Sequence, residues 1–251
     1  MANSVKSGRT GKSRREPARD EYPLQWTPAG LNAAERALFQ RLMDSIADRT
    51  RPPGIKLIED ELSEEFGVSR ERVRRILLVA SQYRIVAIEP NKGASVARPS
   101  PRDRQEAFVL RLLLEGQVVR LLAATNVARQ KVIVTELRRH IEEEQQALLS
   151  GNRALQIKLS GEFHLKMAAQ TGNILLTQML QEVVSFLGLA LASHAYHLSL
   201  DCSIGEHAQL LDAIEAGDVV RAQGLLTDHL SHLEDDMAYN ISIGQDEQAG
   251  S

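Results

Sequence analysis

The sequence predicts a mainly α protein, in which a small helical unit with a β-hairpin precedes an all-α helical bundle. Aromatic residues make up only 4% of the chain, whereas small and branched aliphatic residues are abundant, and this composition suits packed helices. Apolar residues recur at helical spacing along most of the chain. No proline follows Pro101, so the second part lacks the residue that interrupts helices most strongly.

The first part begins with two predicted helices. Residues 1–29 are rich in Ser, Gly, Lys and Arg without periodicity, and they predict a disordered basic arm. A helix follows from Asn32, a candidate N-cap, to Asp48, and Pro52-Pro53-Gly54 ends it. After a short extended piece at 55–58, residues 59–66 predict the second helix.

The segment from Gly67 to Leu77 predicts a tight turn and a third helix. Gly67 can take the left-handed C-cap conformation, and Ser69 is a candidate N-cap. Apolar residues then form one stripe, at Val73, Ile76, Leu77 and Ala80. Four arginines lie off this stripe, at Arg70, Arg72, Arg74 and Arg75. Such a face is also found on ordinary solvated helices, but after a short helix and a tight turn it indicates a helix-turn-helix, whose second helix enters the DNA major groove.

A β-hairpin completes this unit. Apolar residues alternate through 85–89, Asn91-Lys92-Gly93 predicts a turn, and 94–97 predict the return strand. Three helices followed by a hairpin predict a winged helix-turn-helix at 30–98, with the hairpin as a small wing. The candidate DNA-binding residues are Ser69, Arg70, Arg72, Arg74, Arg75, Lys92 and Gly93.

The rest of the chain predicts a linker, a bundle and a tail. Two prolines in residues 99–102 indicate a stiff linker. An all-helical domain is expected at 103–241, with helices near 103–125, 128–150, 152–171, 173–199, 203–216 and 218–241. Glycines and capping Asn, Asp or Ser residues separate these helices. Residues 242–251 are predicted to be a disordered tail.

The distribution of charge separates the two parts. Residues 1–102 contain 19 Lys/Arg and 13 Asp/Glu, and the remainder contains 11 and 20. The first part is therefore basic and the second acidic, which predicts that only the first part binds a polyanion. The single cysteine, Cys202, excludes intrachain disulfides and fits a reducing cytoplasm. No apolar run approaches 18 residues and no signal-peptide core is visible, so we expect a cytoplasmic protein without a membrane span.

Two sets of sequence elements resemble a known family. The segment PPGIKLIEDELSEEFGVSRERVRRIL, followed by NKGASV, resembles the DNA-binding domain of GntR-family bacterial transcriptional regulators. The phrases RLLLEGQVVRLLAA, EFHLKMAAQTGN and EHAQLLDAIEAGDVVRAQGLLTDHL resemble FCD, the helical ligand domain of the FadR subfamily. The chain departs from the family at Glu71-Arg72, where Thr-Pro is usual, and at Arg84-Ile85, where Gly-Leu is common. The first departure predicts a different operator sequence.

The resemblance implies a metal site in the bundle. It places three histidine ligands for a divalent metal such as Zn²⁺ or Ni²⁺ at His164, His207 and His229. The family's fourth ligand, an Asp, is replaced by Ser160, which supplies neither a hard anionic ligand nor a negative charge. We therefore expect reduced metal affinity, or a metal-free pocket in which the histidines bind the ligand directly. Taken one at a time, each histidine also fits a hydrogen-bonded core residue.

The remaining effector candidates lie on two predicted helices. Arg111, four residues before Glu115, offers a guanidinium for a carboxylate. His194 and His197 are candidates to face either the cavity or solvent. The expected effector-binding residues are Arg111, Ser160, His164, His194, His197, His207 and His229. An organic acid and a nitrogen heterocycle both remain open as the effector.

These features predict a ligand-responsive transcriptional regulator, a repressor that a small metabolite releases from its double-stranded DNA operator or retains on it. A homodimer is expected, because a helix-turn-helix reads two half-sites. The alternative is a metal-dependent enzyme built on the three histidines. The sequence contains no H-E-x-x-H or nucleophile motif, so we expect a protein that is not an enzyme.

Overall fold

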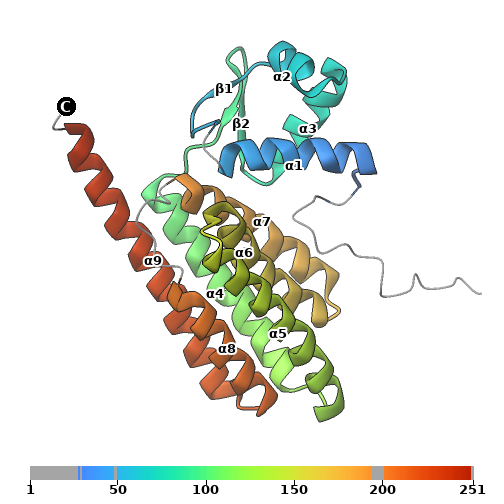
Figure 1. Ribbon diagram of the computed structural model, residues 1–251, viewed down its shortest axis with the longest axis vertical. Coiled ribbons are helices and arrows are strands. Elements are labelled where there is room, and N and C mark those ends of the chain that lie inside the picture. The colour runs from blue at the N-terminus through green and yellow to red at the C-terminus, as the bar shows by residue number, and fades with distance from the viewer. Residues whose placement is uncertain (1–27, 29, 48–49, 194–200, 250–251) are drawn as a thin grey trace, which may run out of the picture.

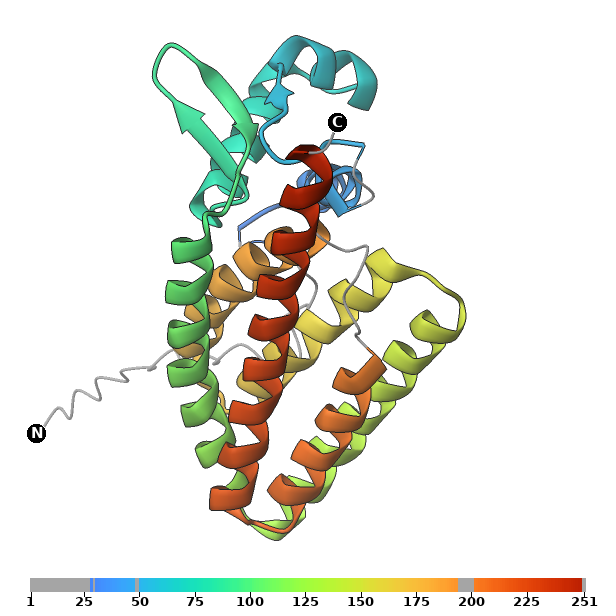
Figure 2. The same ribbon diagram turned by 90° about the vertical axis from the view of Figure 1, so that its left-hand side faces the viewer.

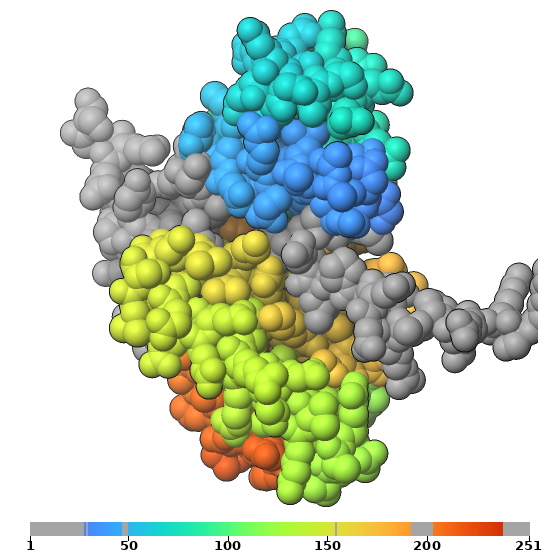
Figure 3. Space-filling view, turned by 45° about the vertical axis from the view of Figure 1, so that its right-hand side comes forward, coloured from blue at the N-terminus to red at the C-terminus, as the bar shows by residue number. Residues whose placement is uncertain are grey.

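The computed structural model describes residues 28, 30–47, 50–193 and 201–249. A winged-helix unit sits on one end of a helical bundle (Figures 1 and 3). The predicted arm at 1–29 lies outside the described residues, apart from Pro28. The predicted mainly α fold, with a winged helix followed by an all-α bundle, is confirmed.

The winged-helix unit contains three helices and three short strands. They are α1 (Ala33–Ala47), β1 (Lys56–Leu57), α2 (Glu59–Phe66), α3 (Arg70–Gln82), β2 (Val86–Glu89) and β3 (Gly93–Val96). The strands form an antiparallel sheet in the order β1-β3-β2, with Leu57 opposite Ala94 and Val86 opposite Val96. The short extended piece of the sequence is thus an edge strand of the wing.

Capping residues fix the helix-turn-helix. Gly67 has φ 67°, and its N–H donates to Glu64 O. The next N–H, of Val68, donates to Ser63 O at 3.1 Å, so the end of α2 has its last carbonyls satisfied. Ser69 accepts a hydrogen bond from Arg72 N and begins α3. Asn32 caps α1 in the same way, accepting from Glu35 N at 3.0 Å.

Within the described residues, the bundle contains six helices. They are α4 (Pro101–Ala123), α5 (Val127–Leu149), α6 (Arg153–Gln170), α7 (Ile174–Ser193), α8 (Asp201–Glu215) and α9 (Val219–Ala249). Helix α4 packs against α6, α7, α8 and α9, and α5 packs against α6 and α8 (Figures 1 and 2). Helix α1 packs against α7, so the two parts of the chain share one apolar core.

Two predicted boundaries are wrong. Helix α4 begins at Pro101, so only residues 99 and 100 of the predicted 99–102 linker precede it. The cause is a capping box, in which Ser100 and Asp103 satisfy each other's backbone N–H groups and proline is accepted in the first turn. At the other end, the predicted 242–251 tail is helical to Ala249, because no proline ends α9.

The sequence led us to expect no apolar run as long as a membrane span, and helix α7 contradicts this expectation. Its segment Ile174–Leu191 is long and apolar enough to cross a membrane by length and composition, with a mean hydropathy of 1.7. Gln178, Gln181 and Glu182 interrupt the apolar residues, which is why no unbroken run is visible in the sequence. In the structure 61% of this segment is buried, and its place in the bundle core accounts for its composition.

Arg84 has a backbone conformation that L-residues rarely adopt. Its φ is 55°, at the position where the family resemblance leads us to expect glycine. The turn needs this angle because Arg84 N and Ile85 N both donate back to the end of α3, at Ser81 O and Ala80 O. The exposed side chain therefore stands on a strained backbone.

We predict that Arg84→Gly raises the free energy of unfolding by about 0.5–1 kcal/mol, because relief of left-handed strain exceeds the extra entropy of glycine in the unfolded chain. Arg84→Ala removes the same side chain but keeps the strain, and it should match the wild type. Urea unfolding curves measure both variants. Equal stabilities for the Gly and Ala variants would contradict this explanation.

Candidate functional site

The four arginines of α3 lie on its exposed side, as predicted. Val73, Ile76, Leu77 and Ala80 of the same helix are buried beneath them. Arg70 Nε lies 2.8 Å from Asp60, and Arg75 Nε lies 3.1 Å from Glu35. Both arginine side chains remain more than half exposed. The Arg70–Asp60 pair is exposed on both sides and contributes little stability, so a phosphate or a base can replace its carboxylate, whereas the Glu35 partner of Arg75 is buried.

Arg74 is held differently from Arg70. Its Nε and Nη2 donate to the two carboxylate oxygens of Glu59, at 2.9 and 2.7 Å. This hydrogen-bonded pair lowers the pKa of Glu59. One edge of the Arg74 guanidinium is thus occupied by α2, whereas Arg70, in the first turn of α3, meets Asp60 through Nε and its side chain is 60% exposed.

The wing tip presents Lys92 and Gly93. Asn91 and Gly93 have φ 63° and 79°, which close the turn between β2 and β3. Lys92 Nζ lies 2.6 Å from Glu89, and the Lys92 side chain is 68% exposed. The wing therefore offers one positive charge on a tight turn whose backbone can approach a phosphate.

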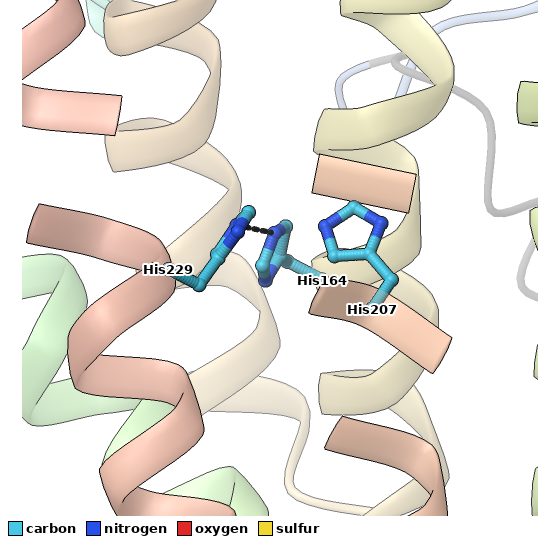
Figure 4. A group of neighbouring side chains, drawn as sticks. All are labelled: His164, His207 and His229. Atoms are coloured by element: carbon cyan, nitrogen blue, oxygen red, sulfur yellow. Dashed lines mark hydrogen bonds between the residues drawn. The ribbon is translucent and has the colours of Figure 1, made fainter. Parts of the chain in front are cut away.

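Inside the bundle, the three predicted histidines converge. His164 of α6, His207 of α8 and His229 of α9 are fully or almost fully buried, and one ring nitrogen from each lies within 4.8 Å of the others (Figure 4). His164 Nε2 and His229 Nε2 are 3.2 Å apart, and the His207 Nε2 has no hydrogen-bond partner among the described residues. Three helices distant in sequence thus form one cluster.

A carboxylate lies behind each histidine, at the opposite ring nitrogen. His164 Nδ1 is 2.5 Å from Glu115 Oε2, although the angle is poor for a hydrogen bond. His207 Nδ1 pairs with Glu144 at 2.9 Å, and His229 Nδ1 pairs with Glu206 at 2.7 Å. Because a carboxylate accepts Nδ1–H, this arrangement leaves the Nε2 lone pairs directed at one another.

Burial keeps the three rings neutral. It lowers the pKa of His207 to about 3 and of His229 to about 4, and it lowers the pKa of His164 well below its ordinary value. The neighbouring Arg111 guanidinium acts in the same direction on all three. Neutral imidazole is the form that binds metals, but lone pairs 3.2 Å apart repel each other without a proton or cation between them.

The pKa values of two of these carboxylates are shifted in opposite directions. The hydrogen bond from His229 lowers the pKa of Glu206 to about 2, and exposed His232 donates to the same carboxylate at 2.7 Å. Burial instead raises the pKa of Glu144 to about 7.

Arg111 and Ser160 line a small cavity beside this cluster. Arg111, predicted to offer its guanidinium to an effector carboxylate, is 3% exposed, and its Nε lies 2.5 Å from Glu115 Oε1 of the same helix. Ser160 lies one helical turn before His164 on α6. The cavity volume is about 10 Å³, and its walls are Arg111, Ile157, Ser160, Gly161, Val184, Leu187, Gly188, Leu191 and Leu233. This space holds about one water, so a larger ligand must displace side chains.

Two of the predicted site residues lie outside the described residues, and the structure places other residues at the site that the sequence did not predict. His194 and His197 lie outside the described residues. Sequence reasoning missed Glu144, Glu206 and His140, which is 1% exposed and lies between Leu159 O and Lys166 Nζ, at 2.7 and 2.6 Å. The only available signals were the four-residue spacing of His140 and Glu144 and the position of Glu206 beside His207. Neither spacing indicates which histidine each carboxylate meets.

Known proteins resemble most of the chain. A model of the FCD domain matches residues 106–232. An uncharacterized HTH-type transcriptional regulator in an unstable DNA locus of Streptomyces ambofaciens is 27% identical over 209 residues, covering 80% of this chain and 84% of the relative. A probable D-xylose utilization operon transcriptional repressor of Paenarthrobacter nicotinovorans is 26% identical over 186 residues, covering 74% and 80%.

Solved structures share the fold. Escherichia coli McbR/YncC superposes with a TM-score of 0.68 at 22% identity, covering 87% of this chain and all of that one. A putative GntR regulator from Rhodococcus sp. RHA1 gives a TM-score of 0.67 at 21% identity, covering 82% and 98%.

We predict that Glu144→Gln removes one component of the pH dependence of stability in the metal-free protein, the component that falls as pH rises. The folded-state pKa of Glu144, near 7, exceeds the unfolded value of 4.5, so its contribution to stability is lost as pH rises through this window, opposite in sign to the contribution of the three histidines, whose pKa values burial lowers. The loss attributable to Glu144 is at most about 3 kcal/mol. Urea unfolding in chelator between pH 4.5 and 8 measures it. Glu143→Gln, at an exposed neighbour, should keep the wild-type slope, and an unchanged slope for Glu144→Gln would contradict the prediction.

Proposed function

This chain belongs to the GntR family of transcriptional regulators and carries an FCD domain, and from this premise we propose how it reads DNA and senses its ligand. As a ligand-responsive transcriptional regulator, it places α3 in the major groove of a double-stranded operator and the wing against the flanking backbone. It acts as a repressor in the cytoplasm, and a small metabolite in the bundle controls its hold on DNA.

The observation that carries the ligand proposal is the histidine cluster with its three carboxylates. Metal-binding histidines commonly donate their second N–H to a carboxylate, which fixes the tautomer and raises the basicity of the metal-binding nitrogen. His164, His207 and His229 are neutral, converge through Nε2 and have Glu115, Glu144 and Glu206 behind them. These residues fit a divalent ion such as Zn²⁺ or Ni²⁺, which would act as a Lewis acid toward an anionic ligand.

Ser160 weakens this site and determines what completes it. Three histidines leave at least one coordination position open, and serine supplies no anionic oxygen to fill it. The three carboxylates behind the rings offset part of the ion's charge, but they do not reach it as ligands. With a divalent ion held by the three histidines, an effector carboxylate would be attracted to both the ion and Arg111, and metal and effector would then bind cooperatively.

The histidine cluster and the cavity beside it have two alternative roles, a metal-free effector site and an enzyme site. In a metal-free protein, the three histidines hydrogen-bond the effector directly, and a nitrogen heterocycle is then as suitable as an organic acid. A three-histidine site with an open position also occurs in metal-dependent enzymes. The arginine face of α3 and the regulators among the relatives favour a non-enzymatic sensor.

Signal transfer requires two arrangements of the winged-helix unit on the bundle. Helix α7 lines the cavity through Val184, Leu187, Gly188 and Leu191, and the same helix packs against α1. An effector with different affinities for the two arrangements shifts the winged-helix units about residues 99 and 100, which precede α4. A homodimer then moves two units relative to two half-sites.

We predict that Ser160→Asp raises Zn²⁺ affinity at least about tenfold, because the carboxylate adds an oxygen ligand and a charge. The wild type should lose its metal to mild chelation, and acetate should slow that loss. The Asp variant should keep stoichiometric metal with or without acetate. Metal analysis after dialysis against chelator measures both proteins.

Ser160→Ala is the matched control and should behave like the wild type. Stoichiometric metal that resists chelation in the wild type would contradict the weak site. A variant that gains no metal would show that the three histidines serve another ligand.

We predict that Arg70→Ala weakens specific binding to a fragment of the protein's own promoter by about 1–3 kcal/mol, because the exposed guanidinium is lost from the start of α3. Arg138→Ala removes a comparably exposed ion-paired arginine from the bundle and should bind normally. Lys92→Ala should weaken binding to all DNA sequences equally and reduce the slope of log affinity against log salt concentration by about 1. Gel shifts at several salt concentrations separate these effects, and full specific affinity in Arg70→Ala would refute the placement of α3.

A further inference from the structure

The outer face of α3 carries one acidic and one apolar side chain among its arginines. Glu71 and Leu78 are both exposed, and the exposed fraction of Leu78 is 51%. Arg75 lies between them, four residues after Glu71 and three residues before Leu78. This spacing places the three side chains in one line along the helix, opposite the buried stripe that begins at Val73. The line therefore faces away from the core of the winged-helix unit.

Glu71 forms no ion pair within the part of the chain that the structure describes. A glutamate on a helix can pair with arginines three or four residues later, which here are Arg74 and Arg75. These two arginines instead meet acids of other helices, Glu59 of α2 at 2.7 Å and Glu35 of α1 at 3.1 Å. The carboxylate of Glu71 is consequently available to accept hydrogen bonds from another molecule.

A carboxylate on this face opposes DNA binding unless a base donates a hydrogen bond to it. Phosphates line both edges of the major groove, and they repel a negative charge that enters the groove. Guanine and thymine present acceptor atoms there, and adenine presents an acceptor, N7, beside its N6 donor. Cytosine presents the N4 amino group, which is the donor that a glutamate accepts from. Cytosine is therefore the base that suits Glu71.

Leu78 adds an apolar group to the same line. A single exposed leucine is common on protein surfaces, but this one follows a row of charged side chains on the helix that the proposed function places in the major groove. Thymine carries an apolar group in that groove, its C5 methyl, and apolar side chains contact it. Leu78 lies seven residues after Glu71, which is roughly 10 Å along a helix. This distance corresponds to about three base pairs, since each base pair adds about 3.4 Å.

We propose that Glu71 and Leu78 determine the operator sequence. Glu71 accepts a hydrogen bond from the N4 amino group of a cytosine, and Leu78 contacts the methyl group of a thymine about three base pairs away. This inference rests on the proposed function, since it requires α3 to lie in the major groove. Glu71 lowers affinity for DNA in general and thereby discriminates against half-sites that offer no N–H group at its position.

Glu71 also has a structural effect on its own helix. It lies in the first turn of α3, where a negative charge interacts favourably with the helix dipole. Loss of that interaction changes the free energy of unfolding but leaves the base preference unchanged. The base preference therefore separates the two roles of Glu71.

The first experiment selects binding sites for the full-length chain from a library of random DNA duplexes. The wild type should enrich a cytosine and, about three base pairs away, a thymine. Glu71→Gln should enrich adenine in place of this cytosine, because glutamine accepts from adenine N6 and donates to N7. Glu142→Gln makes the same change of charge at an exposed position of α5, and this matched control should enrich the wild-type sequence.

A wild-type sequence without the cytosine, or a sequence that Glu71→Gln leaves unchanged, would overturn the role of Glu71. Glu71→Ala covers the case of a glutamine variant that enriches nothing. It should bind random DNA several-fold more tightly than the wild type at low salt, and exchange of the cytosine for thymine should change its affinity less than about twofold. A wild type that enriches no sequence overturns the proposed function together with this inference, whereas enrichment of other bases overturns this inference alone.

The second experiment replaces the enriched thymine by deoxyuridine, which removes only the methyl group. In gel shifts the wild type should lose about two- to fivefold in affinity, because the burial of one methyl group is lost. Leu78→Ser should bind both duplexes equally. Leu175→Ser on α7 is the matched control, since Leu175 is 72% exposed, and it should keep the wild-type preference. Equal affinity of the wild type for the two duplexes would overturn the contact assigned to Leu78.

Discussion

The bundle depends on the pairing of charged and polar groups that it buries. A buried carboxylate is costly unless a partner meets it, and this domain buries Glu115 and Glu144 almost completely. Each also meets a histidine of another helix: Glu115 of α4, paired with Arg111 of its own helix, lies against His164 of α6, and Glu144 of α5 meets His207 of α8. Glu206 of α8 meets His229 of α9, which lies against His164. One network thus joins five helices, and a helix that slid by one turn would leave a buried charge unpaired.

Local sequence patterns were enough for the parts of the fold that local interactions decide. Gly67 and Ser69 correctly predicted the end of one helix and the start of the next. Arg111 and Glu115 lie four residues apart, a spacing at which side chains of one helix are neighbours, and they form an ion pair. The pairing of Glu144 with His207 could not be predicted, because 63 residues separate them and the contact depends on how α5 and α8 align. The extended piece at 55–58 was predicted, but its pairing with β3 was missed for the same reason, since two extended residues carry no sign of their partner.

Helix α7 forms both a wall of the cavity and the contact between the bundle and the winged-helix unit. Its apolar length matches that of a membrane span, yet its residues form the wall of the cavity and the contact with α1. The winged-helix unit consequently rests on the helix that a ligand in the cavity would press against. Because the cavity holds only about one water, a ligand cannot enter without moving this wall. Packed helices transmit such displacements, since cores are dense and poorly compressible.

Helix α4 brings these constraints together. Its first turn is fixed by the Ser100–Asp103 capping box, immediately after the wing, and its inner face holds Arg111 against Glu115. Glu115 in turn lies behind His164, so a change in the charge of the ligand site changes the electrostatic interactions of a buried residue of α4. An anion that draws Arg111 away from Glu115 changes the balance of buried charge on the helix that leads to the DNA-binding unit. In a homodimer, any shift of α4 occurs in both copies. A small rearrangement around one guanidinium would then alter the spacing of two recognition helices, which is the quantity that an operator with two half-sites measures.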